Sequence, residues 1–171
     1  MRRAIYPGSF DPPTLAHAEV LTQASCVFDE VTVLVAQNGG KGKGLLTPEE
    51  RVKAWQKMTS SPVRVLPSDQ SIIHATAEYK AGFVVRGLRG PADFEGEMAY
   101  ADFIRRSGVQ IELAYFMVPP HMTTISSSAV RSMVGLKDGT RTAVLGRYIS
   151  SDVRDVILAS DWNLRNLKLK A

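Results

Sequence analysis

The chain has 171 residues, of which 44% are hydrophobic and 22% are charged, and its formal net charge at pH 7 is +4. This length and composition are typical of one globular domain with a single hydrophobic core, and they exclude a disordered or fibrous protein. The longest apolar runs, such as VTVLVA, are far shorter than the roughly 20 residues of a membrane-spanning helix, and MRRAIYPG lacks the apolar segment of a signal peptide. We therefore expect one domain over residues 1–171, no membrane partner and a cytoplasmic location.

Charge and cysteine content limit the ligands. The 21 lysines and arginines are spread along the chain without a long basic block. Such a charge is compatible with nucleic acid and at least as compatible with a phosphorylated small molecule; we expect the small molecule and no nucleic acid. A single cysteine, Cys26, excludes an internal disulfide, and we expect it to be buried. Neither Cys26 nor the three histidines shows metal-ligand spacing, so the metal ligands stay unassigned.

Short apolar runs alternate with longer amphipathic segments. The runs show little apolar/polar alternation, which is expected for parallel strands that are covered on both faces. They predict strands at Ala4–Pro7, Val31–Ala36, Val63–Leu66, Phe83–Arg86 and Ile111–Val118. The pattern as a whole is typical of an α/β fold built on a five-stranded parallel sheet with helices on both faces.

Helix boundaries carry their own signals. Thr14 is the expected N-cap of the first helix, and TPEE at Thr47–Glu50 is a capping box with proline at the first helical position. Gly82 and Gly108 are expected to end the third and fourth helices. The predicted helices are Thr14–Ala24, Pro48–Met58, Ser71–Lys80, Pro91–Arg106, Ser127–Val134 and Ser151–Leu158.

The unusual residues of the chain follow the predicted strands. GSFDPPTLAH follows the first strand, QNGGKGKG the second, RGLRG the fourth and PPHMTTISSSAVR the fifth. In open parallel sheets, ligands bind beyond the carboxyl ends of the strands where the strand order reverses. Because these clusters are rich in glycine, basic and hydroxyl residues, the sequence predicts one anion-lined crevice at that end of the sheet.

His17 is a candidate ligand of a phosphate in this crevice. If the first helix buries Leu15, Ala18 and Leu21, His17 lies about 200° from Leu15 and points away from the core. There the helix N-terminus already favours an anion, and an imidazole adds a hydrogen bond. An exposed histidine without a role is the alternative.

The other clusters each have two interpretations. In ISSSAVR, Ser126 to Ser128 cap a helix or bind a second phosphate as well, and Arg131 closes over that phosphate or is solvated. In RGLRG, Arg86 and Arg89 are flanked by glycines that allow the backbone to approach a ligand, so both arginines could hold phosphates. Glu97 is either a ligand of a bound molecule or an exposed helix acid.

The segments AIYPGSFDPPTLAH, TPEERV, VVRGLRGPADFEGEM and ISSSAVR, in this order between about Arg3 and Val134, resemble the phosphopantetheine adenylyltransferase family of the nucleotidyltransferase superfamily. The resemblance implies a Rossmann-like fold and Mg²⁺-dependent transfer of the adenylyl group from ATP to 4′-phosphopantetheine. It further implies a homohexamer and feedback by coenzyme A.

The resemblance also assigns site residues. His17, Lys41 and Arg89 are the implied catalytic residues, and Ser9, Lys41, Ile72 and Arg86 are the implied contacts to phosphopantetheine, with Ile73 as the alternative to Ile72. The implied ATP-binding residues are Ser9, Phe10, His17, Gly87, Leu88, Arg89, Glu97, Met122, Thr123, Thr124, Ile125, Ser126, Ser127 and Ser128.

The chain departs from the family pattern at several positions. Ala16 replaces the glycine of the T-x-G-H motif, and Met122 stands where an aromatic residue is common. Two ways of matching this loop to the family pattern disagree about the lysine that contacts the substrate. Counted forward from Asn38, the position is Lys41; counted back from Thr47, it is Gly42, between Lys41 and Lys43. The chain also has a basic C-terminal extension from about residue 161. Two alternatives stay open: a sister enzyme acting on nicotinamide mononucleotide or a polyol phosphate, and a nucleotide-binding protein with weakened catalysis, which Ala16 favours.

Overall fold

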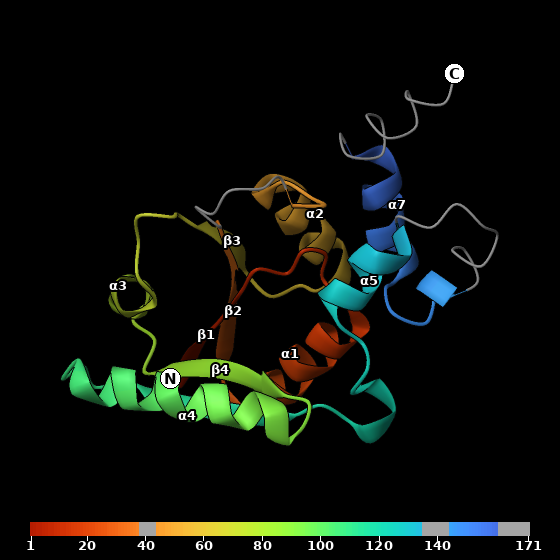
Figure 1. Ribbon diagram of the computed structural model, residues 1–171. Coiled ribbons are helices and arrows are strands. Elements are labelled where there is room, and N and C mark those ends of the chain that lie inside the picture. Colours follow the sequence, from red (N-terminus) through yellow and green to blue (C-terminus); the bar gives the residue numbers. More distant parts are fainter. Residues whose placement is uncertain (38–43, 135–143, 161–171) are drawn as a thin grey trace.

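The apolar runs form one five-stranded parallel sheet in the order β3-β2-β1-β4-β5 (Figure 1). This computed structural model describes residues 1–37, 44–134 and 144–160. Every predicted strand is confirmed to within two residues at each end, and the strand order reverses at β1 and β4. The strands are β1 (Arg3–Gly8), β2 (Glu30–Ala36), β3 (Val63–Leu66), β4 (Phe83–Leu88) and β5 (Glu112–Met117).

All six predicted helices are present, and a short 3₁₀ helix after β5 was not predicted. Thr14 and Thr47 are N-caps with complete capping boxes, as expected from the sequence. The helices are α1 (Leu15–Val27), α2 (Pro48–Met58), α3 (Ile72–Glu78), α4 (Pro91–Arg106), η1 (Pro120–Met122), α5 (Ser127–Val134) and α7 (Ser151–Ala159).

Side chains that alternate along the central strands enter two different cores. Tyr6 of β1 packs in a core that α1 and Trp55 of α2 complete on one face. The neighbouring residue Ile5 packs with Leu34 and with Ala75 of α3 on the other face. The predicted Rossmann-like arrangement, with helices on both faces of a parallel sheet, is therefore confirmed.

The buried side of α1 differs from the prediction. The expected stripe of Leu15, Ala18 and Leu21 was wrong at its first two positions: α1 buries Ala16, Val20, Leu21 and Ala24. The reason is close packing on the sheet, since a Cβ at Gly87 of β4 would lie 2.9 Å from a methyl group of Val20. Small residues at this contact allow the helix to approach the strand.

Two further expectations are corrected. Cys26 is exposed, because it lies in the last turn of α1 beyond the part of that helix that packs on the sheet. Gly82 does not end α3, which stops at Glu78; the chain turns at Lys80, where φ is 50°, and Gly82 directly precedes β4. Gly108, with φ of 71°, follows the end of α4 as predicted.

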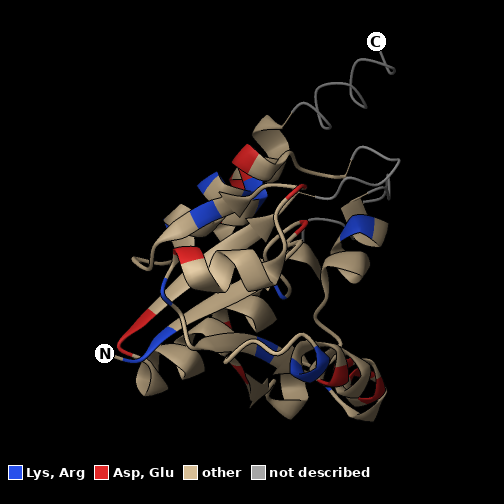
Figure 2. Ribbon diagram, turned by 90° about the vertical axis from the view of Figure 1, so that its left-hand side faces the viewer, with Lys and Arg blue, Asp and Glu red and all other residues tan. Residues whose placement is uncertain are grey.

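Helix α4 and the edge strand β5 are weakly covered. Of the sixteen residues of α4, only Ile104 is buried, while Phe94, Met98 and Phe103 are exposed. Met117 of β5 is exposed as well. Figure 2 shows basic and acidic segments interspersed over the described part of the chain, in agreement with their scattered positions in the sequence. No helix within residues 1–37, 44–134 and 144–160 is long and apolar enough to cross a membrane.

Candidate active site

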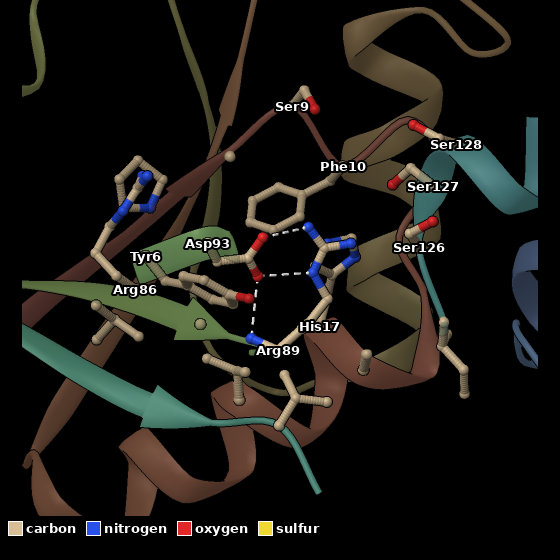
Figure 3. A pocket seen from close by; sticks show the side chains of 18 of the residues that line it. Tyr6, Ser9, Phe10, His17, Arg86, Arg89, Asp93, Ser126, Ser127 and Ser128 are labelled. Atoms are coloured by element: carbon tan, nitrogen blue, oxygen red, sulfur yellow. Dashed lines mark hydrogen bonds and ion pairs between the residues drawn. The ribbon is translucent and has the colours of Figure 1, made fainter. Parts of the chain in front are cut away.

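A cavity of about 540 Å³ lies where the strand order reverses. The ends of β1 and β4 and the first turns of α1, α4 and α5 surround it, so three of the four predicted loop clusters meet in one crevice (Figure 3). The fourth cluster, with Lys41 and Lys43, lies mostly outside the described residues, as does the C-terminal extension. The predicted residues that line the cavity are Ser9, Phe10, His17, Arg86, Gly87, Arg89, Glu97, Ile125, Ser126, Ser127 and Ser128.

Several described residues that were predicted to contact a ligand do not line the cavity. Ile72, at the start of α3, packs against the core on the other face of the sheet. Leu88 is buried, and its carbonyl accepts a hydrogen bond from the Val118 N–H. Met122 packs against the core beside α1. With Thr123 and Thr124, these residues keep their assignment to a ligand only as a prediction.

Phe10 fixes the loop that follows β1. Its backbone is left-handed, with φ of 47°. Its buried ring meets the rings of Tyr6, Trp55 and His17 edge-on, each at a centroid distance of 5.1 Å. The rings of Tyr6 and Trp55 also meet edge-on, at 6.3 Å. A Cβ at Gly8 would lie 2.7 Å from this ring, so only glycine allows the fold of the loop. Ser9 is thereby held at the edge of the cavity.

A buried ion pair supports the same loop and was missed in the sequence. The Asp11 carboxylate accepts the N–H groups of Leu45 and Leu46 at 3.0 and 2.8 Å and lies 3.7 Å from Arg51 Nε. The Arg51 guanidinium donates to the carbonyls of Ser9 and Ala36 at 3.0 and 3.2 Å. One feature of the sequence could have indicated this ion pair. Arg51 lies three and four positions before Ala54 and Trp55, the other buried residues of α2, so the pattern places a charge on the apolar face of the helix.

His17 is oriented by the cap of its own helix. The Thr14 N–H donates to His17 Nδ1 at 3.1 Å, so in the neutral ring Nε2 carries the hydrogen. Burial of the ring, with the charge of Arg89 acting in the same direction, lowers the pKa of His17 to about 4. The expectation that His17 points away from the core was wrong, because its ring packs on Phe10. At neutral pH the cavity therefore contains an uncharged N–H donor at this position.

Both arginines of RGLRG are paired with carboxylates of α4. Arg89 donates from Nε and Nη2 to Asp93, each at 2.9 Å, and Figure 3 shows this pair beside His17. Arg86 donates from Nε and Nη2 to Glu97 and lies 4.9 Å from the centre of the Tyr100 ring. The hydrogen bonds from Arg89 hold the pKa of Asp93 below its ordinary value. Burial lowers the pKa of Arg86, but the hydrogen bonds and charge of Glu97, together with Tyr100 and Tyr115, raise it above its ordinary value.

The hydroxyl run joins the start of α5 to the loop after β1. Ser126 Oγ accepts the Ala129 N–H at 3.1 Å, which confirms its capping role, and Ser127 Oγ donates to the Pro12 carbonyl at 2.8 Å. Arg131 lines the cavity and donates to the Asp11 carbonyl at 2.7 Å and to Ser128 Oγ at 3.0 Å. Two helix N-termini, those of α1 and α5, therefore face one cavity, an arrangement suited to a polyphosphate.

The charges of the cavity favour an anion. Among the described residues that line it, Arg86, Arg89 and Arg131 are basic and Asp93 and Glu97 are acidic, which leaves an excess of one positive charge while His17 is neutral. The described part of the chain holds no cluster of three or more histidine, cysteine, aspartate or glutamate side chains that could bind a metal ion. Such a cavity can bind phosphates and donate hydrogen bonds to a reacting phosphate.

Comparisons with known proteins agree with this geometry. Residues 5–133 match the family model described as Cytidylyltransferase-like. The phosphopantetheine adenylyltransferase of Neisseria meningitidis serogroup C (strain 053442) is 33% identical over 165 residues, which cover 92% of this chain and 93% of that protein. The protein of the same name from Clostridium novyi (strain NT) is 38% identical over 136 residues, 78% of this chain and 84% of that protein.

A solved structure shows the same fold. The nicotinic acid mononucleotide adenylyltransferase of Plasmodium falciparum, complexed with APC, aligns over 99% of both chains with a TM-score of 0.66 and 15% identity. At this identity the likeness concerns the fold alone. The relatives at 33% and 38% identity, by contrast, match 92% and 78% of the chain. The chain belongs to the phosphopantetheine adenylyltransferase family.

Proposed function

We propose that the protein transfers the adenylyl group of ATP to the phosphate of 4′-phosphopantetheine, forming dephospho-coenzyme A and pyrophosphate. The observation that carries this proposal is the cavity at the reversal of strand order, where His17, Arg86 and Arg89 meet two helix N-termini in a chain of this family. This reaction needs sites for two phosphorylated molecules, and the cavity offers basic groups on both β4 and α5.

In the proposed step, an oxygen of the acceptor phosphate forms a bond to the α-phosphorus of ATP. The bond from that phosphorus to the bridging oxygen breaks, and pyrophosphate leaves with the electron pair. A phosphate monoester has a second pKa of about 6, so the acceptor is largely ionised at neutral pH and needs no general base. Asp93 and Glu97, the carboxylates of the cavity, are engaged by arginines and suit no such role.

The proposed catalysis rests on position and charge. His17 Nε2–H donates a hydrogen bond to the α-phosphate as negative charge develops on it, which a neutral imidazole can do without losing a proton. Arg89 and the serines of α5 hold the phosphates of ATP, and Arg86 holds the acceptor phosphate. Lys41 remains the predicted third cation.

Mg²⁺ is part of the proposal as a companion of ATP. With no cluster of three or more metal-binding side chains among the described residues, the ion would take its ligands from phosphate oxygens and water, as Mg²⁺ does in many nucleotide sites. It supplies neutralisation of the phosphate charge. The experiment is a comparison of turnover with and without a chelator.

Ala16 supports an active rather than a weakened protein. Ala16 is 3% exposed and packs in the core between α1 and the sheet, although it also borders the cavity. The methyl group is thus directed largely into protein that has room for it. The names of the curated relatives favour phosphopantetheine over nicotinamide mononucleotide or a polyol phosphate as the acceptor.

The proposed assembly is a homo-oligomer, with a hexamer as the family resemblance implies. Its support is the apolar surface of α4 and β5, where Phe94, Met98, Phe103 and Met117 are exposed. The size of the particle, measured by light scattering, tests this proposal. Feedback by coenzyme A and a cytoplasmic location stay predictions.

Pyrophosphate release tests the proposed function directly. The purified protein is given ATP and Mg²⁺ with 4′-phosphopantetheine, with nicotinamide mononucleotide, or with no acceptor. We expect release only with 4′-phosphopantetheine. Release with nicotinamide mononucleotide alone would assign the chain to the alternative acceptor, and no release with either would support a protein with weakened catalysis.

A further inference from the structure

Two arginines at the edge of the cavity are held in the same way. Arg86 and Arg89 each present Nε and Nη2 to one carboxylate, those of Glu97 and Asp93. The two carboxylates are four residues apart on α4, so one helix face supports both pairs. Among the described residues, no hydrogen bond engages Nη1 of either arginine.

This geometry leaves one side of each guanidinium for a ligand. A guanidinium can present two N–H groups along its Nη1–Nη2 edge to a phosphate while its Nε side is bound to a carboxylate. Arg86 and Arg89 line the cavity, so the unengaged edge is available to bound phosphates. The Tyr100 ring, 4.9 Å from the Arg86 guanidinium, further limits how Arg86 can turn.

Asp93 holds Arg89 at two points. Its Oδ2 accepts the backbone N–H of Arg89 at 3.0 Å as well as the side-chain Nε–H at 2.9 Å. Asp93 stands in the first turn of α4, where a carboxylate commonly accepts an N–H that precedes the helix. Stabilisation of the helix start alone is therefore the competing explanation for Asp93.

We propose that Asp93 is a positioning residue for ATP, which it serves by fixing Arg89. This inference rests on the proposed function for the identity of the ligand. It assigns a role to Asp93, which the sequence did not single out, while the expected contact of Glu97 with the nucleotide stays a prediction.

Charge and position predict opposite results for the loss of Asp93. Replacement by asparagine removes a negative charge from a cavity that binds a polyanion, and by charge alone it strengthens the binding of ATP. If Asp93 instead fixes Arg89, the same replacement frees the arginine to adopt other rotamers and weakens ATP binding. The sign of the change in affinity therefore separates the two effects.

The experiment compares Asp93→Asn with Asp102→Asn. Asp102 forms the same kind of pair on the same helix, four residues from Arg106 and 2.6 Å from its Nε, but it lies outside the cavity lining. We expect Asp93→Asn to raise the Kd of Mg²⁺–ATP, measured by calorimetry without acceptor, about tenfold. Asp102→Asn should leave this Kd unchanged, and the two variants should have similar melting temperatures.

Kinetics then test which substrate depends on Asp93. In the full reaction, Asp93→Asn should raise KM mainly for ATP and leave KM for 4′-phosphopantetheine nearly unchanged. Combined with Arg89→Ala, Asp93→Asn should cost no further ATP affinity, because the carboxylate acts only through the arginine. If Asp93→Asn does not fold, Asp93→Glu replaces it, since it retains the charge but displaces the carboxylate, and it too should weaken ATP binding.

Two results would overturn the inference. These are tighter ATP binding by Asp93→Asn and additive losses in the double variant with Arg89→Ala. The ATP measurements need no acceptor, so they stand even if the wild-type protein does not use 4′-phosphopantetheine. Failure of the proposed function would appear instead as absent pyrophosphate release with intact ATP binding.

Discussion

Asp11 and Arg51 form a buried ion pair that joins the loop after β1 to helix α2, with 3.7 Å between Asp11 Oδ1 and Arg51 Nε. Both side chains are also hydrogen-bonded to backbone groups: Asp11 accepts two N–H groups, and Arg51 donates to three carbonyls. The pair therefore satisfies the polar backbone of the loop that presents Ser9 to the cavity.

Removal of one partner should be costly. Arg51→Met leaves the Asp11 carboxylate buried without its cation, and we expect the free energy of unfolding in urea to fall by about 3 to 5 kcal/mol. The exposed pair of Lys57 and Asp152, 4.0 Å apart, is the control, and Lys57→Met should change the free energy by less than about 1 kcal/mol. Equal, small effects in the two variants would contradict a structural role for Arg51.

The protonation of His17 should be visible in the pH dependence of stability. Its pKa of about 4 in the folded chain is below the ordinary value of 6.5, so protonation favours the unfolded chain. The folded chain with a neutral His17 therefore has its full stability above about pH 6.5, and it loses stability as the pH falls toward 4. We expect the wild type to lose roughly 1 to 3 kcal/mol relative to His17→Gln over this range, measured by urea unfolding.

His74→Gln, at an exposed position of α3, is the matched control for that experiment. An NMR titration of labelled histidines provides the direct measurement, with His17→Gln identifying the signal. A His17 signal that titrates near pH 6.5 would show that the ring is solvated and charged near neutrality, and would contradict its role as an uncharged donor.

Ala16→Gly tests how the chain tolerates a methyl group where its family has glycine. Because alanine favours a helix over glycine by roughly 1 kcal/mol and the Ala16 methyl is buried, we expect a lower melting temperature. We expect kcat/KM for ATP to change by less than about tenfold, since the methyl group packs largely into the core. An inactive wild type that becomes active in Ala16→Gly would show that the methyl group displaces ATP.

Arg86→Ala tests the assignment of the two arginines. Loss of a charge-assisted contact to the acceptor phosphate should weaken 4′-phosphopantetheine binding by roughly 1.5 to 3 kcal/mol and change ATP binding little. Calorimetry with each ligand measures both effects. An equal loss for ATP would place Arg86 at the nucleotide instead.

Features that depend on neighbours in the chain were predictable from the sequence. The apolar runs marked all five strands, and Thr14, Thr47 and Gly108 marked helix ends correctly, because caps and strand patterns involve residues only a few positions apart. The position of the cavity followed as well, since parallel strands bring their carboxyl ends to one edge of the sheet.

Features that depend on distant residues were decided by the tertiary structure. Helical periodicity alone did not identify which face of α1 is buried: close packing of Val20 on Gly87 turns Ala16 and Val20, rather than Leu15 and Ala18, toward the core. The same holds for Arg51, whose partners Ser9 and Asp11 lie some forty residues earlier in the chain. Their contact forms only once β1 and α2 have packed. A buried charge is stable only when it is paired, and the fold decides which groups lie close enough to pair with it.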